Sequence, residues 1–287
     1  MTTLFLSMVV FQMGCQQNPM ELALVEEAGA VNIMHAFHSE DLKTWTHRGA
    51  QAWGVASLGM TQHQNGNLLL MAIQEVRPPN WYEERFGPPV YGFEYDGSSL
   101  APKAWKIEDK DTKAYIDPQF FENQMWYISP SGTFGDPAKR ETQMPVRSSN
   151  PGQVRYQGVN FADPSPVRFK GELHLFMSKD LHIFHAKGNP LEMIQVHPKV
   201  NDIFYKASVP YAFVVDSEGE EEIWLTAQSN IQGKRVPVLA KSKDALFWSN
   251  WEPIGNIPKS MKNCTSPVMG PDPKGGWIMF CIEELLH

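Results

Sequence analysis

Two Asp-Pro pairs, Asp117-Pro118 and Asp163-Pro164, each stand directly before a short apolar alternation. Apolar residues at every second position, interrupted by a Gly turn, are typical of a β-hairpin. Carboxyl groups brought together at the starts of successive strands can act as acid, base or nucleophile. The structural alternative is a turn in which each Asp binds its own backbone. Both interpretations are open at this point.

The elements that carry these residues repeat along the chain. After Asp117 and Asp163, similar hairpins begin at Ser208 and Thr265, at intervals of 46, 45 and 57 residues, and a degenerate first copy covers residues 55–72. Repeats of roughly 40–50 residues, each forming a four-stranded sheet, are typical of β-propellers. The sequence therefore predicts an all-β, five-bladed β-propeller.

A second motif marks the outer strands. Residues 36–45 and 239–248 share Ser, Asp and Trp at the same spacing, and residues 177–184 carry a fainter copy. Ser and Asp in this pattern accept hydrogen bonds from turn N–H groups, so that the aromatic residue packs between sheets. The first copy precedes every inner hairpin, and the last hairpin lacks outer strands. We therefore expect the N- and C-terminal strands to share the closing blade, which leaves no open edge.

Composition restricts the function classes. The 287 residues carry a net charge of −7 and no basic run, which excludes nucleic acid and anionic membrane surfaces as expected partners. Phosphate-loop, zinc and nucleophile-elbow motifs are absent from the sequence. His35 and His38, like His182 and His185, would point to opposite faces of a strand, so no metal site is predicted. No cofactor is required, and a structural cation in the central channel stays open.

The beginning and end of the sequence carry cysteines. Residues 1–14 are apolar and lead through Gly14 to Cys15, as in a bacterial lipoprotein signal, although a basic start is missing. We expect residues 1–19 to be an export signal and tether, residues 20–287 to form one domain, and the protein to be periplasmic or cell-surface, with a lipid anchor at Cys15 as its membrane contact. Cys264 and Cys281 flank the last hairpin, either as a disulfide or as two buried thiols.

Together, the acid-Pro pairs and the Ser-x-Asp-Leu-x-x-Trp motif of residues 39–45 resemble the propellers of glycoside hydrolase families 43 and 32. The resemblance implies a funnel lined by the starts of the inner strands, in which one carboxylic acid protonates the leaving oxygen and another acts as base or nucleophile. It places Asp117 at the position that orients the acid or stabilises the transition state. Asp163 stands where family 43 has a Glu acid, although the local Glu-Gly-Pro-like pattern is absent.

The first blade departs from that family pattern. Its inner strand carries Ser57 where the base or nucleophile is expected. Second strands return to the same rim, so Glu75 and Glu283 are the candidates to supply the missing carboxylate. The alternative for both is a solvated rim charge or a carboxylate that binds N–H groups of a loop.

Aromatic residues of the loop over 76–95, Trp81, Tyr82 and Phe86, are the expected substrate-binding groups, because aromatic faces stack on sugar rings. Two functions follow. The first is an exported hydrolase of arabinose-, xylose- or fructose-containing glycans. The second is a catalytically degenerate propeller that binds sugars or another surface partner. Unrelated chemistry in the same funnel is a third reading.

Overall fold

The computed structural model describes most of the chain, in segments separated by short gaps. The described residues are 32–62, 65–74, 90–103, 116–122, 124–130, 143–148, 162–179, 181–188, 192–196, 207–217, 219–255 and 257–285. They form nineteen β-strands and no helix, so the fold is all-β. Within these segments there is accordingly no helix long and apolar enough to cross a membrane.

The strands make five separate antiparallel sheets. In chain order, the first four sheets are β3(Val55–Gln62), β4(Leu68–Gln74), β5(Val90–Tyr95) and β6(Leu100–Lys103); β7(Ile116–Phe121), β8(Gln124–Pro130) and β9(Gln143–Ser148); β10(Ala162–Phe169), β11(Glu172–Lys179), β12(His182–Lys187) and β13(Glu192–Val196); and β14(Ala207–Ser217), β15(Glu220–Ile231), β16(Lys234–Ser242) and β17(Glu252–Pro253). The fifth sheet has the order β18(Thr265–Pro271), β19(Trp277–Glu283), β1(Ile33–Ser39) and β2(Thr46–Trp53).

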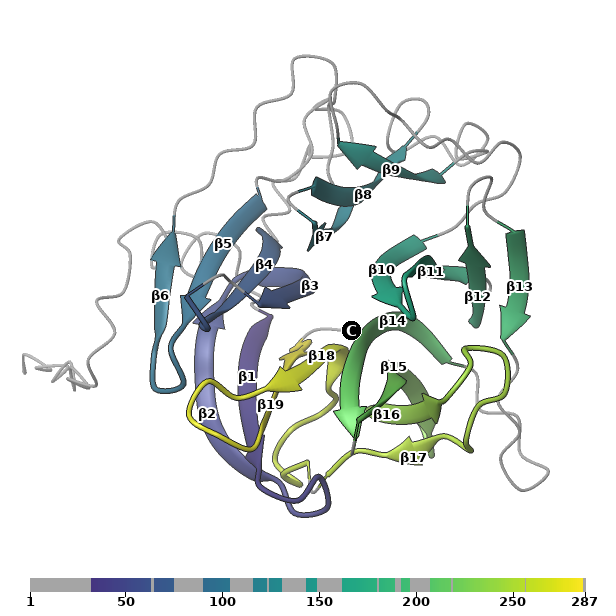
Figure 1. Ribbon diagram of the computed structural model, residues 1–287. Helices are drawn as coiled ribbons and strands as arrows, with labels where there is room; N and C mark the ends of the chain where they lie inside the picture. Colours follow the sequence, from purple (N-terminus) through teal and green to yellow (C-terminus); the bar gives the residue numbers. More distant parts are fainter. Residues whose placement is uncertain are drawn as a thin grey trace, which may run out of the picture.

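The five sheets surround a common centre (Figure 1). The first strand of each sheet lies innermost, and these strands contact one another in the order β3, β7, β10, β14 and β18, with β18 in contact with β3 again. Each sheet is thus adjacent to the next, and the last is adjacent to the first.

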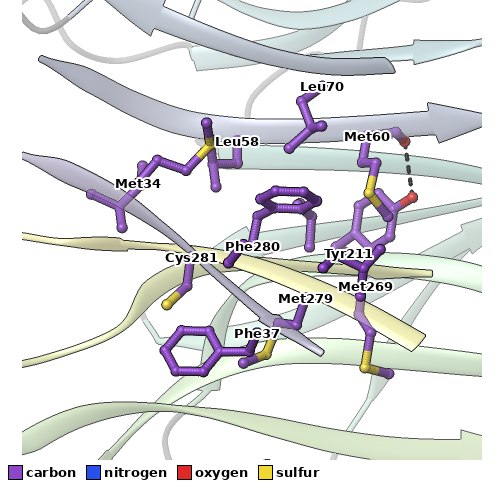
Figure 2. Close-up of a cluster of buried hydrophobic side chains, with 14 of the residues drawn as sticks. Met34, Phe37, Leu58, Met60, Leu70, Tyr211, Met269, Met279, Phe280 and Cys281 are labelled. Atoms are coloured by element: carbon purple, nitrogen blue, oxygen red, sulfur yellow. Dashed lines mark hydrogen bonds between the residues drawn. The ribbon is translucent and has the colours of Figure 1, made fainter. Parts of the chain in front are cut away.

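The fifth sheet joins segments from both ends of the chain, as the sequence predicted. The strand β1 pairs antiparallel with β19 over seven residue pairs, from Ile33 opposite Glu283 to Ser39 opposite Trp277. Buried side chains of β1, β18 and β19 pack with those of β3 in one cluster that includes Phe37, Phe280 and Met60 (Figure 2). Burial of these apolar side chains holds the N-terminal strands to the C-terminal hairpin.

All five inner strands begin with the same irregularity. Two residues oppose one on the neighbouring strand, and the first of the two has a positive φ between 48° and 54°. These five bulge residues are Ser57, Asp117, Asp163, Val209 and Ser266. The left-handed conformation is uncommon for residues other than Gly, and its recurrence at one position in all five sheets makes it a feature of the architecture.

The bulges correct the alignment of the repeats. The alignment of the repeats in the sequence made Ser208 and Thr265 equivalent to the two aspartates. In the structure, the equivalent residues are the next ones along the chain, Val209 and Ser266. Apolar alternation alone does not reveal a two-for-one bulge, which is why the assignment was wrong by one residue.

The Ser-x-Asp turns have the predicted role at two of three places. Asp41 Oδ1 accepts bonds from two turn N–H groups at 2.8 Å each, and Asp244 Oδ1 does the same at 2.9 and 2.8 Å. Trp45 lies beside Gly255, which follows β17 of the fourth sheet. Trp248 contacts Phe176 of β11, in the third sheet. The faint copy beginning at Ser178 is different, because it joins β11 to β12 rather than a third strand to a fourth.

Cys264 and Cys281 form a disulfide. Both residues are fully buried, and their Cα atoms are 5.4 Å apart. Of the two alternatives left open by the sequence, the structure therefore has the bonded one, and the bond ties the start of β18 to the end of β19.

Candidate functional site

Asp117 and Asp163 lie next to each other at the centre of the ring. They occupy the bulge positions of β7 and β10, and the backbone N–H of Asp163 donates to Asp117 Oδ2 at 3.3 Å. A side-chain hydrogen bond also joins the two carboxyl groups. The structure thus brings together the two aspartates that the sequence singled out, from neighbouring sheets.

Both carboxyl groups hold protons more tightly than an ordinary Asp. Burial raises the pKa of Asp117, while hydrogen bonds from Ser57 and from Asp163 act in the opposite direction. Burial, and then the charge of Asp117, raise the pKa of Asp163 well above its usual value. Two adjacent, half-buried carboxyl groups cannot both ionise at low cost. Asp163 is therefore the proton donor within the pair, and Asp117 the acceptor.

The remaining three bulge positions carry no acid. They are Ser57, Val209 and Ser266. The hydroxyl of Ser57 bonds the carboxyl group of Asp117, so the first sheet also contributes to the pair. Within the described residues, the ring of bulge positions therefore offers two carboxyl groups, both on one side of it.

Side chains from the ends of second strands connect the bulges around the ring. The N–H of Val209 donates to Ser178 Oγ at 2.7 Å, and the N–H of Ser266 donates to Gln228 Oε1 at 3.1 Å. Ser178 also bonds the carboxyl group of Asp163. Since the Ser178 oxygen accepts from Val209, its own hydrogen is available for Asp163. Second strands do return to the same rim, as expected.

A layer of buried side chains closes the centre next to the bulges. Gln119 Nε2 donates to the Met60 carbonyl at 2.7 Å, while Gln119 Oε1 accepts from the Met60 N–H at 3.1 Å. The Tyr211 hydroxyl, from β14, donates to the same Met60 carbonyl at 2.9 Å (Figure 2). Gly59 leaves the space for this contact, because a Cβ there would lie 2.2 Å from the Pro118 carbonyl oxygen. Three inner strands meet at this point and form a floor beneath the aspartate pair.

Glu283 is engaged away from the aspartates. Its Oε2 lies 3.2 Å from His35 Nε2, and its Oε1 accepts the N–H of Lys262 at 2.8 Å. The residue is buried in the closing sheet. The structure places both oxygens of this predicted catalytic candidate within the sheet, in bonds to groups other than the aspartate pair.

The other predicted site residues are Glu75, Trp81, Tyr82 and Phe86, and they lie outside the described residues. The residue before Glu75 is described. Gln74, at the end of β4, pairs with Val55, which lies two residues before Ser57.

Sequence reasoning missed Gln119 and the roles of Ser57 and Ser178. Gln119 follows the first Asp-Pro pair directly, and a polar residue at an apolar position of the alternation is the signal that could have identified it. No group of three or more His, Cys, Asp or Glu side chains in the described segments could hold a metal ion.

No protein-family model and no curated protein matches this chain. Solved structures are similar in fold. A thermostable family-43 glycoside hydrolase has a TM-score of 0.51 at 13% identity, over 82% of this chain and 90% of its own. The catalytic domain of the Coprinopsis cinerea GH62 alpha-L-arabinofuranosidase has a TM-score of 0.50 at 12% identity, over 81% and 91%. The Bacteroides ovatus xyloglucan PUL GH43B has a TM-score of 0.50 at 12% identity, over 84% of this chain and 49% of its own. The chain thus shares its fold with β-propeller glycoside hydrolases.

Proposed function

We propose that the five sheets are the blades of a five-bladed β-propeller and that the protein hydrolyses glycans at its centre. Asp163 is the general acid of this proposal, and Asp117 is the neighbour that keeps it protonated. The observation that carries the proposal is the contact between the two aspartates, in which burial and the charge of Asp117 raise the pKa of Asp163. A carboxyl group whose pKa is raised keeps its proton to higher pH and can donate it to a leaving glycosidic oxygen.

The fold supports this choice of substrate class. The similar solved structures include a family-43 glycoside hydrolase and an alpha-L-arabinofuranosidase. Fold alone does not determine function, so hydrolysis is proposed from the aspartate pair. Arabinose-, xylose- and fructose-containing glycans are the substrates that we propose to test.

Hydrolysis needs a second carboxylate, which acts as base or nucleophile. It would stand about 5–5.5 Å from the acid in a retaining enzyme and about 6.5–9.5 Å from it in an inverting one. Glu75 is the proposed residue, because it directly follows Gln74, which pairs beside the Ser57 bulge. Glu283 is the weaker candidate, since both its oxygens are already bonded.

The proposal is tested by screening wild-type protein on aryl arabinosides, xylosides and fructosides, and then on the matching oligosaccharides. We expect Asp163→Asn and Asp117→Asn to lower kcat/KM by about 10²–10⁴-fold, the usual contribution of a positioned acid, with unchanged circular dichroism. On substrates whose leaving group needs no proton, the Asp163→Asn variant should regain activity and a Glu75→Gln variant should not. An active enzyme indifferent to all three substitutions would contradict the assignment.

Sugar binding without hydrolysis is the second candidate function. Ser57 favours it, because the bulge equivalent to Asp117 and Asp163 in the first sheet carries no carboxylate. On this proposal, Trp81, Tyr82 and Phe86 stack on sugar rings. A glycan array tests this function. Binding that is weakened by Trp81→Ala and releases no product would favour sugar binding over hydrolysis.

Export is proposed from the sequence, with residues 1–19 as signal and tether, Cys15 as the lipid-modified residue, and residues 20–287 as one domain. Metabolic labelling with a palmitate analogue tests this. The wild-type protein should be labelled and the Cys15→Ser variant should not.

A further inference from the structure

One face of the fifth sheet, β18-β19-β1-β2, carries three polar side chains in a row. His35 of β1 lies between Glu283 of β19 and His47 of β2. Its Nε2 is 3.2 Å from Glu283 Oε2, and its Nδ1 is 3.0 Å from His47 Nε2. Neither of these two contacts involves the aspartate pair.

Irregular pairing of β1 with β2 produces this arrangement. The register shifts between Met34 and His35 and again between Ala36 and Phe37, which places His47 opposite Phe37. The rings of Phe37 and His47 stack, with centroids 4.8 Å apart. Bulges redirect side chains and are frequent beside functional sites. Here they bring the His47 ring onto His35 and fix its orientation.

Glu283 determines which nitrogen of His35 carries the proton. A carboxylate beside Nε2 favours the tautomer with hydrogen on that nitrogen, so Nδ1 presents its lone pair to His47. Metal-binding histidines in proteins are held in the same way, with the distal nitrogen bonded to a carboxylate.

We propose that His35 Nδ1 and His47 Nε2 bind one transition-metal ion of the Zn²⁺, Ni²⁺ or Cu²⁺ class, with water as the remaining ligands. Two nitrogens at about 2.0–2.1 Å from one ion stand roughly 3.3–3.4 Å apart in a tetrahedral site and roughly 2.9 Å apart when they bind at right angles, and the observed separation is 3.0 Å. Imidazole prefers these ions over Mg²⁺ and Ca²⁺, which take oxygen ligands. His47 is exposed, so the ion and its waters can reach the pair.

A second histidine pair provides the comparison. His174 Nδ1 lies 2.8 Å from His185 Nε2, but His185 is completely buried and its Nδ1 has no hydrogen-bond partner. Water cannot complete a coordination sphere at a buried pair. The carboxylate beside this pair is also farther away, because Glu172 Oε2 lies 4.0 Å from His174 Nε2, compared with 3.2 Å between Glu283 Oε2 and His35 Nε2. This pair should not bind metal, although its nitrogens are equally close.

The experiment uses tag-free protein in a Cys15→Ser background, so that no cysteine outside the disulfide competes for metal. Isothermal titration with ZnCl₂, NiCl₂ and CuCl₂ at pH 7.5 should give saturable binding of one ion per chain, while MgCl₂ gives none. We expect His47→Gln to weaken binding at least tenfold and Glu283→Gln to weaken it about tenfold or more, since second-shell partners contribute 10–100-fold. His174→Gln should bind like the parent protein.

His47 is exposed, so its variant reports on binding even if His35→Gln fails to fold. Absence of saturable binding, or binding unchanged in His47→Gln, would overturn the site and leave the pair as a hydrogen bond. Metal binding weakened equally by His174→Gln would also contradict it. None of these results depends on glycan activity, so the site can fail or stand independently of the proposed function.

Discussion

At the residue scale, the aspartate pair depends on Ser178. Its oxygen accepts the Val209 N–H at 2.7 Å, which directs the hydroxyl hydrogen toward Asp163. A hydrogen bond to the ionised form lowers the pKa of a carboxyl group. Ser178 therefore limits how far burial and Asp117 raise the pKa of Asp163, and acts as a positioning residue of the proposed acid.

Ser178→Ala should raise the pKa of Asp163 further, because the variant loses the donor to the carboxylate. Infrared titration of the protonated carboxyl band measures the change in this pKa. The difference from the Asp163→Asn spectrum isolates the signal of the aspartate pair. In an active enzyme, the basic limb of the pH profile should move to higher pH. Ser178→Thr retains a hydroxyl and should behave like the wild type. An unchanged titration in Ser178→Ala would show that the hydroxyl only supports the turn.

At the scale of the element, each inner strand carries a bulge residue with a positive φ. Val209 adopts a left-handed backbone despite its branched side chain, which costs on the order of 1–2 kcal/mol. Such strain persists where neighbouring contacts over-determine it, and it is common at functional sites. Here the Val209 N–H is bonded to Ser178, so the bulge and the proposed acid are stabilised by one side chain.

Gly59→Ala should be more destabilising than an ordinary surface substitution, because its Cβ would meet backbone rather than a flexible side chain. The Pro118 carbonyl oxygen would lie 2.2 Å away and Gln119 Oε1 2.5 Å away. Overpacking of this kind costs about 1–3 kcal/mol, and here it should also separate Gln119 from Met60. Urea unfolding measures the loss.

The matched control for Gly59→Ala is Gly171→Ala, in an open turn with nothing within 4 Å of the added Cβ. Gly171 has a φ of +80°, so its cost of about 1 kcal/mol should come from backbone strain alone. Equal losses in the two variants would argue against a packed floor.

The sequence predicts the hairpins and the shared sheet, but not the bulges or the contacts between sheets. Alternating apolar residues and Gly turns predict hairpins, and the sharing of one sheet by β1 and β19 follows from where the motifs stand in the chain. The bulges shift the register by one residue without changing that alternation, so Val209 and Ser266 were not recognised. The bonds of Gln119 to Met60 and of Ser178 to Val209 join strands of different sheets. Such contacts depend on the packing of sheets against each other, which a single sequence does not encode as a local pattern.

At the scale of the whole molecule, a partly buried charge cluster connects the fifth sheet to the first. Arg48 of β2 donates to Asp272 at 3.1 Å and to the Tyr95 hydroxyl of β5 at 2.6 Å. The Asp272 side chain is fully buried, and burial is the main cause that raises the pKa of Tyr95 to about 12. This cluster and the β1–β19 pairing are two separate attachments at the place where the ring closes.

Stability of the whole ring should fall in mild acid, because four histidines are held neutral in it. Burial is the first cause that lowers the pKa of His35, His47, His174 and His185, that of His185 to about 3. The unfolded chain binds these protons below a pKa of about 6.5 and the folded chain does not. Stability is therefore complete above that value and decreases as the pH falls from about 6.5 toward 3.

His185 alone should account for roughly 2–3 kcal/mol of unfolding free energy between pH 6 and pH 4, from one proton taken up on unfolding. Urea unfolding at half-unit pH steps measures this slope. His185→Leu removes the titrating group while retaining an apolar side chain beside Phe176, so its stability should depend less on pH by about one proton across this range. A His185→Leu variant with the full wild-type slope would show that other groups govern the acid sensitivity.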